Sequence, residues 1–390
     1  MDNTGQGKTA IYVVLFFMSL IMHIQFPIFT PYAVALGATT FFISILLSVS
    51  SLANLCGNLI AGPFIDKFGK KQFIVVPLFL SAFIMIAHGF VSNPESLLVL
   101  RLFNGFVLAF LTPACFALLS GYAKNSHQQG KNMAVNGLLI TVANIVAPLI
   151  GGYLVEYADF RGTYLIIGTS LLFTAVTALL YIKEMQPIVL HKKGKGKKSG
   201  LLLDKQLLSV YFVGFALMYA QGTLIYELPF LVIEEGLSTS ATGKLFSLMG
   251  IGTLIVVCML WINRISAFIR TVFGMLVVGM CFYQMVIPVI SLSLSQLLLL
   301  TGMGLGVLFP AITTLLTEKV EKDEHGTAFG ILSAVFSLGI VASSLVAGAV
   351  REVISPYFIA FLVMIISVTC IGLYHYNLNR RSDLQSVSEL

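Results

Sequence analysis

"GPFIDKFGKK", the stretch from Gly62 to Lys71, places one acid and three lysines between two long apolar runs. The chain around it has 390 residues, of which 57% are hydrophobic and 10% are charged, whereas about a quarter of the residues of a soluble domain are charged. Apolar runs of about twenty residues recur throughout, and each can cross a hydrocarbon core of about 30 Å as a helix. The sequence therefore predicts an all-α integral membrane protein.

The apolar runs predict twelve transmembrane helices. Their expected ranges are 10–34, 41–64, 73–92, 96–122, 131–155, 162–182, 206–232, 241–262, 271–292, 296–317, 327–350 and 355–377. No small-residue cleavage signature follows the first run, so we expect a retained helix and not a signal peptide. The five cysteines are odd in number and lack CxxC spacing, which argues against a disulfide framework or a metal site.

Lysine and arginine predict the orientation, because short cytoplasmic loops retain them. With the N-terminus inside, 19 of the 23 basic residues lie on the inner side, and Arg101 falls within a span. We therefore expect a multi-pass protein of the cell membrane with both termini in the cytoplasm. The net charge of +6 follows from this topology, so no nucleic-acid partner is expected.

A polar interval near the midpoint, "KEMQPIVLHKKGKGKKSG" from Lys183 to Gly200, predicts a boundary. We expect a six-helix bundle at 1–182, a basic cytoplasmic linker at 183–205 and a second six-helix bundle at 206–390. The linker lacks the GxxxxGK[ST] spacing of a phosphate-binding loop, so we interpret it as a solvated connector.

The two predicted bundles resemble each other in sequence, which indicates an internal duplication. Gly105 and Pro113 are eight residues apart in the fourth run, and Gly302 and Pro310 repeat this spacing 197 residues later. The fifth and eleventh runs match at an offset of 196. Two parallel halves with pseudo-twofold symmetry suit alternating access, in which one bundle rocks against the other about a midplane site.

The quoted stretch resembles the G-x-L-a-D-R-x-G-R-K loop of the major facilitator superfamily, and it lies between the second and third runs, as in that family. The residues that carry the match are Gly62, Phe64, Asp66, Lys67, Gly69, Lys70 and Lys71. The resemblance covers essentially the whole chain and implies a twelve-helix secondary transporter. It also implies an inner gate, in which Asp66 caps the start of the eleventh helix near Gly326 and Thr327. A solvated, positive-inside turn is the alternative.

Two further elements resemble the drug:proton antiporter branch of that family. The fifth run matches G-x8-G-x3-G-P-x2-G-G with alanine in place of three glycines, at Ala134, Ala143, Ala147, Pro148, Gly151 and Gly152. Small residues at this spacing let helices approach closely, so an ordinary packing seam is the alternative. Arg101 and Gly105 match the R-x-x-x-G element of the fourth helix, where the resemblance implies an arginine that assists proton movement. Snorkelling of Arg101 to the nearby membrane surface is the alternative.

Proton coupling requires groups that change charge, and our candidates are Glu227, Arg101 and His23. Glu227, in "YELPF", is an acid within reach of the expected central cavity, and His23 lies in a first run that has no carboxylate. An exposed helix-end glutamate and an ordinary interhelical histidine are the alternatives. Neutral polar residues on the spans are candidates for substrate contact: Gln25, Asn104, Asn136, Asn144, Tyr219, Gln221, Tyr226, Tyr283 and Gln284.

The sequence contains no nucleophile elbow, metal-binding histidine pair or dinucleotide fingerprint, so we expect neither an enzyme nor a cofactor. The favoured function is proton-coupled export of a small organic molecule, either a drug-like compound or a secreted metabolite such as a metallophore. Import or symport of a small polar solute, and lipid flipping, stay open. The expected partners are the substrate, protons and the lipid bilayer, and a monomer is expected because this is usual in the family.

Overall fold

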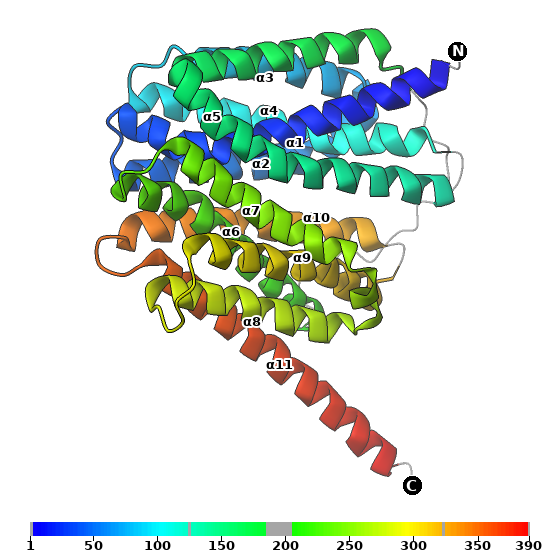
Figure 1. Cartoon of the computed structure of the whole chain (residues 1–390). Coiled ribbons are helices and arrows are strands. Elements are labelled where there is room, and N and C mark those ends of the chain that lie inside the picture. Colours follow the sequence, from blue (N-terminus) through cyan, green and yellow to red (C-terminus); the bar gives the residue numbers. More distant parts are fainter. Residues whose placement is uncertain (1–2, 124–125, 185–204, 322–323, 389–390) are drawn as a thin grey trace. The chain divides into compact units, whose positions relative to one another are not determined.

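The computed structural model describes residues 3–123, 126–184, 205–321 and 324–388, and these residues form helices and no strand (Figure 1). The helices are α1 (Asn3–Ala35), α2 (Thr40–Phe68), α3 (Gln72–His88), α4 (Pro94–Gly121), α5 (Ser126–Tyr181), α6 (Lys205–Glu234), α7 (Thr239–Cys258), the short 3-10 helix η1 (Leu260–Arg264), α8 (Ala267–Val286), α9 (Leu294–Lys319), α10 (His325–Val350) and α11 (Pro356–Ser388). Within the described residues, ten helices are long and apolar enough to cross a membrane, and α3 is apolar but shorter. The prediction of an all-α membrane protein is confirmed.

Helix α5 contains two helices joined at a single residue. Its 56 residues are interrupted at Asp159, where φ is 53° and ψ is −175°. This conformation lies outside the left-handed helical region that aspartate adopts readily, and it is supported by the Asp159 carboxylate, which accepts a hydrogen bond of 2.8 Å from the Gly162 amide at the start of the second part. The two parts of α5 correspond to the predicted fifth and sixth spans, so the described helices are consistent with twelve spans.

Three predicted spans extend too far at their C-terminal ends. The third ends at His88 and not at residue 92, the eighth ends at Cys258 and not at 262, and the ninth ends at Val286 and not at 292. The last error has a clear cause. Residue 287 precedes Pro288, and the proline ring disfavours helical geometry at the preceding residue.

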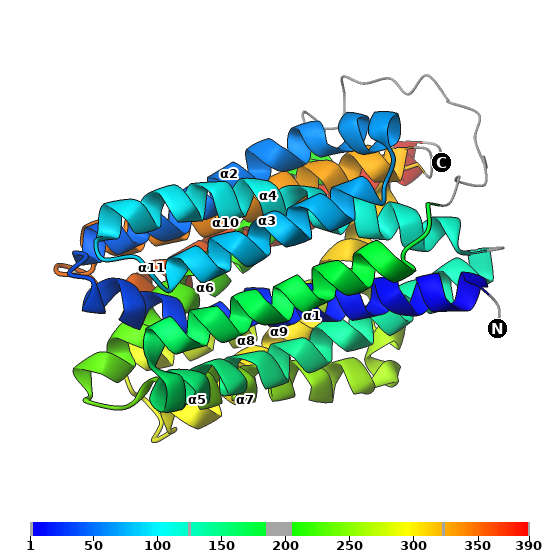
Figure 2. The ribbon, with the colours of Figure 1, turned by 90° about the horizontal axis from the view of Figure 1, so that it is seen from above.

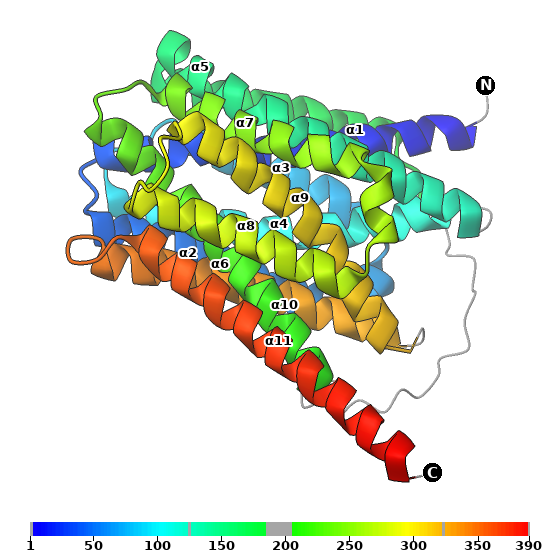
Figure 3. The same ribbon diagram turned by 60° about the horizontal axis from the view of Figure 1, so that its bottom comes forward.

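The helices cluster into two compact units, one of Met1–His191 with Ile225–Gly250 and one of Lys192–Leu224 with Ile251–Leu390. In the first unit α1 packs against α5, α2 packs against α4, and α3 packs against both α4 and α5 (Figure 2). In the second unit α8 packs against both α9 and α11 (Figure 3). The predicted bundle boundaries stay a prediction, and most of the predicted linker lies outside the described residues.

In each unit the carbonyl of a duplicated glycine accepts a hydrogen bond from a side chain of another helix. In the first unit the Asn54 amide on α2 donates a hydrogen bond of 3.3 Å to the Gly105 carbonyl on α4. In the second unit the Thr253 hydroxyl on α7 donates a hydrogen bond of 2.9 Å to the Gly302 carbonyl on α9. Gly105 and Gly302 are the glycines paired by the 197-residue offset. A hydrogen bond to the paired glycine therefore joins the second and fourth helices of each half, although the donor differs in kind and position, and this supports the inferred duplication.

Candidate functional site

Arg101 lies on the buried face of α4, about two turns from its start. Asn93 caps this helix by accepting a hydrogen bond of 2.8 Å from the Ser96 amide, and Pro94 occupies the first turn. The Arg101 side chain is only 9% exposed. Its Nη1 donates a hydrogen bond of 2.6 Å to Gln25 Oε1, and its Cζ lies 3.9 Å from the centroid of the Phe29 ring. The guanidinium therefore joins α4 to α1.

The partner of Arg101 in this contact is a neutral amide. The Gln25 amide nitrogen is directed to the Ile21 carbonyl at 3.4 Å and to the Met85 sulfur at 3.7 Å, so its oxygen is left for the arginine. The Nε of Arg101 is buried without a hydrogen-bond partner in the described structure. A buried charge is costly unless it is paired or fully hydrogen-bonded, and such residues within membrane spans are usually functional.

His88 and Tyr164 extend this cluster, and the sequence analysis did not identify either of them. His88 is the last residue of α3 and is fully buried. Its ring stacks on the ring of Tyr164, from the second part of α5, with centroids 5.1 Å apart. The Tyr32 hydroxyl donates a hydrogen bond to the His88 carbonyl. The available signal was an ionisable residue at the end of an apolar run, in "IAHGF".

Of the predicted site residues, Arg101 and Gln25 are brought together by a hydrogen bond. Glu227 is only 5% exposed on α6, so it is not an exposed helix-end glutamate. The adjacent Tyr226 is buried and donates a hydrogen bond of 2.9 Å to the Thr40 carbonyl. His23 is half-buried; its Nδ1 lies 2.6 Å from the Ser19 carbonyl of the same helix, and its ring meets Phe26 edge-on.

The neutral candidates of the first unit differ in their environments. Asn104 and Asn136 are buried, and the side-chain oxygen of each has no hydrogen-bond partner in the described structure. Asn144 is half-buried. Buried amide oxygens are normally satisfied by protein or by water, so Asn104 and Asn136 retain the capacity to accept a hydrogen bond.

The candidates of the second unit are Tyr219, Gln221, Tyr283 and Gln284. Tyr219 is buried beside Phe215, Gln221 is half-buried, and Tyr283 packs on Phe361. The Gln284 oxygen accepts hydrogen bonds from the amides of Val289 at 3.0 Å and Ile290 at 3.3 Å, and its nitrogen donates to the Ile290 carbonyl. The side chain of Gln284 therefore holds the turn that follows α8.

The fifth-span motif forms a close-packed seam with α1 and α7. Ala143, Ala147 and Pro148 are buried. A Cβ on Gly151 would collide with the Ile24 carbonyl of α1, and one on Gly152 would lie 2.7 Å from the Ser240 Cα of α7. The seam is reinforced by the Ser247 hydroxyl, which donates a hydrogen bond of 2.6 Å to the Ile145 carbonyl. The small residues therefore set how closely these helices approach.

The turn within "GPFIDKFGKK" is held by a residue that the sequence analysis did not identify. Gly69 has φ of 95°, a conformation that glycine adopts without strain. The Glu184 carboxylate accepts hydrogen bonds from the amides of Lys70 at 3.0 Å and Lys71 at 2.7 Å, directly before α3 begins. The Lys71 ammonium donates a hydrogen bond of 2.8 Å to the Leu179 carbonyl. This turn is thus anchored to the end of α5.

The remaining gate residues add little to this anchor. Lys67 lies 5.0 Å from the Phe68 ring, and Gly62 has open space around it. The side chain of Asp66 and residue Gly326 lie outside the part of the chain whose side chains are described. The capping of the eleventh helix by Asp66 therefore stays a prediction.

We expect Glu184→Gln to loosen this turn, because the amide lacks the charge that strengthens both hydrogen bonds. Hydrogen exchange at the Lys70 and Lys71 amides should accelerate about fivefold, the effect of losing a helix cap. The measurement is hydrogen–deuterium exchange followed by mass spectrometry of the peptide that covers residues 66–75. Glu235→Gln, at an exposed glutamate, is the control, and equal exchange in both variants would contradict the anchoring role.

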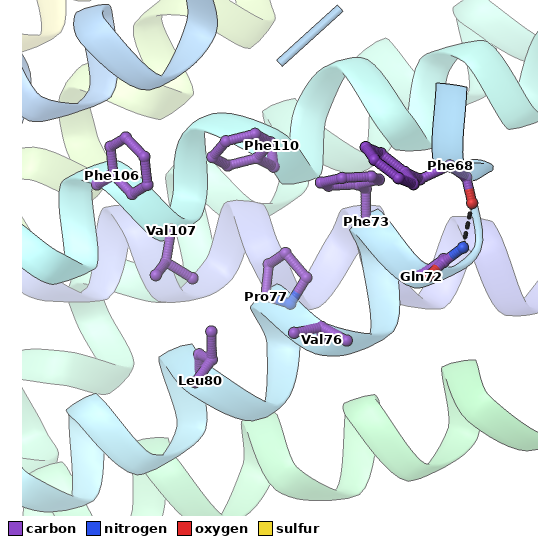
Figure 4. Close-up of a pocket in the computed structure, with 9 residues that line it drawn as sticks. All are labelled: Phe68, Gln72, Phe73, Val76, Pro77, Leu80, Phe106, Val107 and Phe110. Carbon is purple, nitrogen blue, oxygen red and sulfur yellow. Dashed lines mark hydrogen bonds between the residues drawn. The ribbon is translucent and has the colours of Figure 1, made fainter. Parts of the chain in front are cut away.

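An apolar groove of about 320 Å³ lies between α3 and α4 (Figure 4). Its lining residues are Phe68, Gln72, Phe73, Val76, Pro77, Leu80, Phe106, Val107 and Phe110. The polar member, Gln72, donates a hydrogen bond to the Phe68 carbonyl, and Phe68, Val76 and Leu80 are exposed large hydrophobic residues. The groove offers no charged side chain and does not include Arg101, so it is distinct from the buried polar cluster.

Comparisons with known proteins agree with this architecture. The sequence model described as Major Facilitator Superfamily matches residues 11–344 and 294–386. The multi-drug resistance efflux pump PmrA of Streptococcus pneumoniae serotype 4 is 25% identical over 326 residues, which cover 80% of this chain and 79% of the relative. Multidrug resistance protein 1 of Bacillus subtilis (strain 168) is 24% identical over 338 residues, covering 82% and 83%. A bacterial homologue of the human lysosomal transporter Spinster, solved inward-facing and unoccupied, superimposes with a TM-score of 0.75 at 15% identity, covering 96% of this chain and 95% of that one.

Proposed function

Because this chain belongs to the major facilitator superfamily, and is therefore a membrane transporter and not an enzyme, we propose that it exports small organic molecules in exchange for protons by alternating access. The observation that carries the proposal is the buried guanidinium of Arg101, held by Gln25 and Phe29. A full charge buried at this position is costly, and charged residues within membrane spans usually have a function. The similarity to multidrug efflux pumps supports export of a drug-like compound or of a secreted metabolite such as a metallophore.

In this proposal Glu227 binds the exchanged proton and Arg101 responds to its charge, with His23 as a second titratable group. The buried amides of Asn104 and Asn136 offer oxygen atoms to a polar substrate. The protein acts as a monomer in the cell membrane, with both termini in the cytoplasm and the "GPFIDKFGKK" turn as part of the inner gate. The three alanines in place of motif glycines permit a second candidate, a proton-coupled importer or symporter with the same fold.

Proton exchange can be measured in inside-out membrane vesicles that contain the protein and carry an imposed pH gradient. For an exporter, we expect ethidium to dissipate the gradient, because each ethidium cation that enters the vesicle is exchanged for protons that leave it. A pH-sensitive dye reports this change. An importer would couple ethidium movement to protons in the opposite sense. Absence of any proton movement with ethidium and with a panel of metallophores would contradict proton-coupled export.

Glu227→Gln should lower this gradient-driven transport by about tenfold or more, since coupling between two sites commonly amounts to 5- to 150-fold. Glutamine has the same shape as glutamate but cannot bind and release a proton in this pH range. Glu235→Gln, at an exposed helix-end glutamate, is the matched control. Full gradient-driven transport by Glu227→Gln would remove Glu227 from the coupling mechanism.

A further inference from the structure

The apolar groove between α3 and α4 is open to the surroundings of the protein. Of its lining residues, Val76 is 54% exposed, Leu80 46% and Phe106 39%. Helices α2 and α3 both pack against α4, and residues of all three line the groove (Figure 4). The polar side chain of the lining, Gln72, is hydrogen-bonded to the Phe68 carbonyl. The groove therefore offers little to water and suits an apolar occupant.

The groove ends at the level of the lipid headgroups. The apolar span of α2 extends to Ile65, and α3 begins at Gln72. Phe68 and Phe73 lie together at one end of the groove, and Leu80 lies toward the other (Figure 4). Since Phe68 belongs to the turn just beyond the span, this end of the groove lies where the hydrocarbon core gives way to headgroups.

A positive charge lies at the Phe68 end of the groove. The Lys67 ammonium is 5.0 Å from the centroid of the Phe68 ring, and Lys67 is exposed. The Lys71 ammonium is directed to the Leu179 carbonyl. The turn carries three lysines and one acid, and Glu184, which is hydrogen-bonded to its amides, adds a second negative charge. The sum is positive, so this end of the groove attracts an anion.

The length of the groove matches an acyl chain in one leaflet. Phe73 and Leu80 are seven residues apart on α3, which corresponds to about 10 Å at 1.5 Å per residue. One leaflet contributes about 15 Å to a hydrocarbon core of about 30 Å. A chain that enters at Phe68 can therefore follow the groove through most of its leaflet.

We propose that this groove binds one acyl chain of an anionic phospholipid whose phosphate lies on the Lys67 ammonium. A phospholipid combines a phosphate at headgroup depth with an apolar chain that runs inward from it, which is the arrangement of charge and groove seen here. An apolar helix of a second copy of the chain would bring no phosphate, and a free phosphate would bring no chain. This lipid site is independent of the proposed transport reaction.

The charge is tested by native mass spectrometry of the full-length protein, with phosphatidylglycerol added to the detergent solution. We expect one phosphatidylglycerol to stay bound to the wild type. Lys67→Gln should weaken this binding about fivefold, the effect of one lysine near a lipid surface, and should change the binding of the neutral phosphatidylcholine less. Lys244→Gln is the matched control, because Lys244 is also exposed and also lies over an aromatic ring, that of Tyr153.

The groove is tested by filling it. Val76→Trp should weaken the binding of both lipids about tenfold, the effect of displacing about two methylene groups. Phe83→Trp is the control, because Phe83 is exposed on the same helix but does not line the groove. The unfolding temperature without lipid checks that each variant is folded, and phosphatidylglycerol should raise it less in Val76→Trp than in Phe83→Trp.

The two variants must act together for the proposal to hold. Equal phosphatidylglycerol binding by the wild type, Lys67→Gln and Val76→Trp would overturn it. A loss in Lys67→Gln alone would place the chain outside the groove, and a loss in Val76→Trp alone would remove the phosphate contact, so either result contradicts the site. A protein dimer in the spectra that Val76→Trp abolishes would assign the groove to a second copy and would also overturn the proposal.

Discussion

Arg101→Gln should lower gradient-driven transport by about a hundredfold. The substitution removes the charged hydrogen bond to Gln25 and the contact with the Phe29 ring. Coupling free energies between two sites reach about 3 kcal/mol, a factor of about 150, so the loss of a charge that couples proton binding to transport should have an effect of this size. Transport is measured as ethidium movement driven by a pH gradient in proteoliposomes, normalised to the amount of inserted protein.

Two further variants make this result specific to the buried guanidinium. Arg161→Gln removes an arginine that also lies over an aromatic ring, with its Cζ 4.7 Å from the Phe90 centroid. Unlike Arg101, Arg161 is exposed. We expect it to transport normally. Arg101→Lys keeps the charge but loses the planar fork of donors, so it should recover only part of the activity. Normal transport by Arg101→Gln would contradict a role for this charge.

Gly105→Val should destabilise the folded protein by about 3 kcal/mol, the upper end of the usual effect of overpacking. A Cβ at this position would overlap the Ser50 carbonyl oxygen of α2, and backbone atoms cannot move aside as a side chain can. The branched side chain would separate α2 from α4 and break the hydrogen bond from Asn54. We expect a lower thermal unfolding temperature in detergent solution.

The control for this prediction is Gly137→Val, in a helical position on α5 where an added Cβ meets no atom within 4 Å. Both variants replace a helical glycine by valine, so they change helix propensity by the same amount. The difference between their unfolding temperatures therefore reports the cost of disturbing the close approach of α2 and α4. An unfolding temperature for Gly105→Val equal to that of Gly137→Val would mean that the helices can separate at no cost.

The sequence predicted the helices and the small-residue seams well, because both follow from apolar length and from residue size. Gly105, Gly151 and Gly152 were identified by spacing, and each lies against the backbone of another helix. Helix ends were harder to predict, because apolar residues continue past them: after α8, "IPVI" is apolar and yet forms a turn held by Gln284. The pattern alone cannot show that an amide is used for such a local purpose.

The polar cluster was predicted only in part, for a related reason. Arg101 stands out as a charge within an apolar run, and Gln25 stands out as an amide. A histidine at the end of a span resembles many residues at membrane surfaces, so His88 becomes noticeable only when its ring is seen buried against Tyr164. Glu184 was counted within the linker, and its role depends on a contact more than one hundred residues away in sequence.

The break in α5 at Asp159 has a consequence for how the fifth and sixth spans are connected. The fifth and sixth spans meet at one non-helical residue. No loop therefore separates the first arm of α5, which carries Gly152, from the second arm, which carries Tyr164. The first arm touches α7 at Gly152, and the second arm carries the Tyr164 ring that stacks on His88. Only Asp159 separates the helix that packs on α7 from the helix that packs on the buried imidazole.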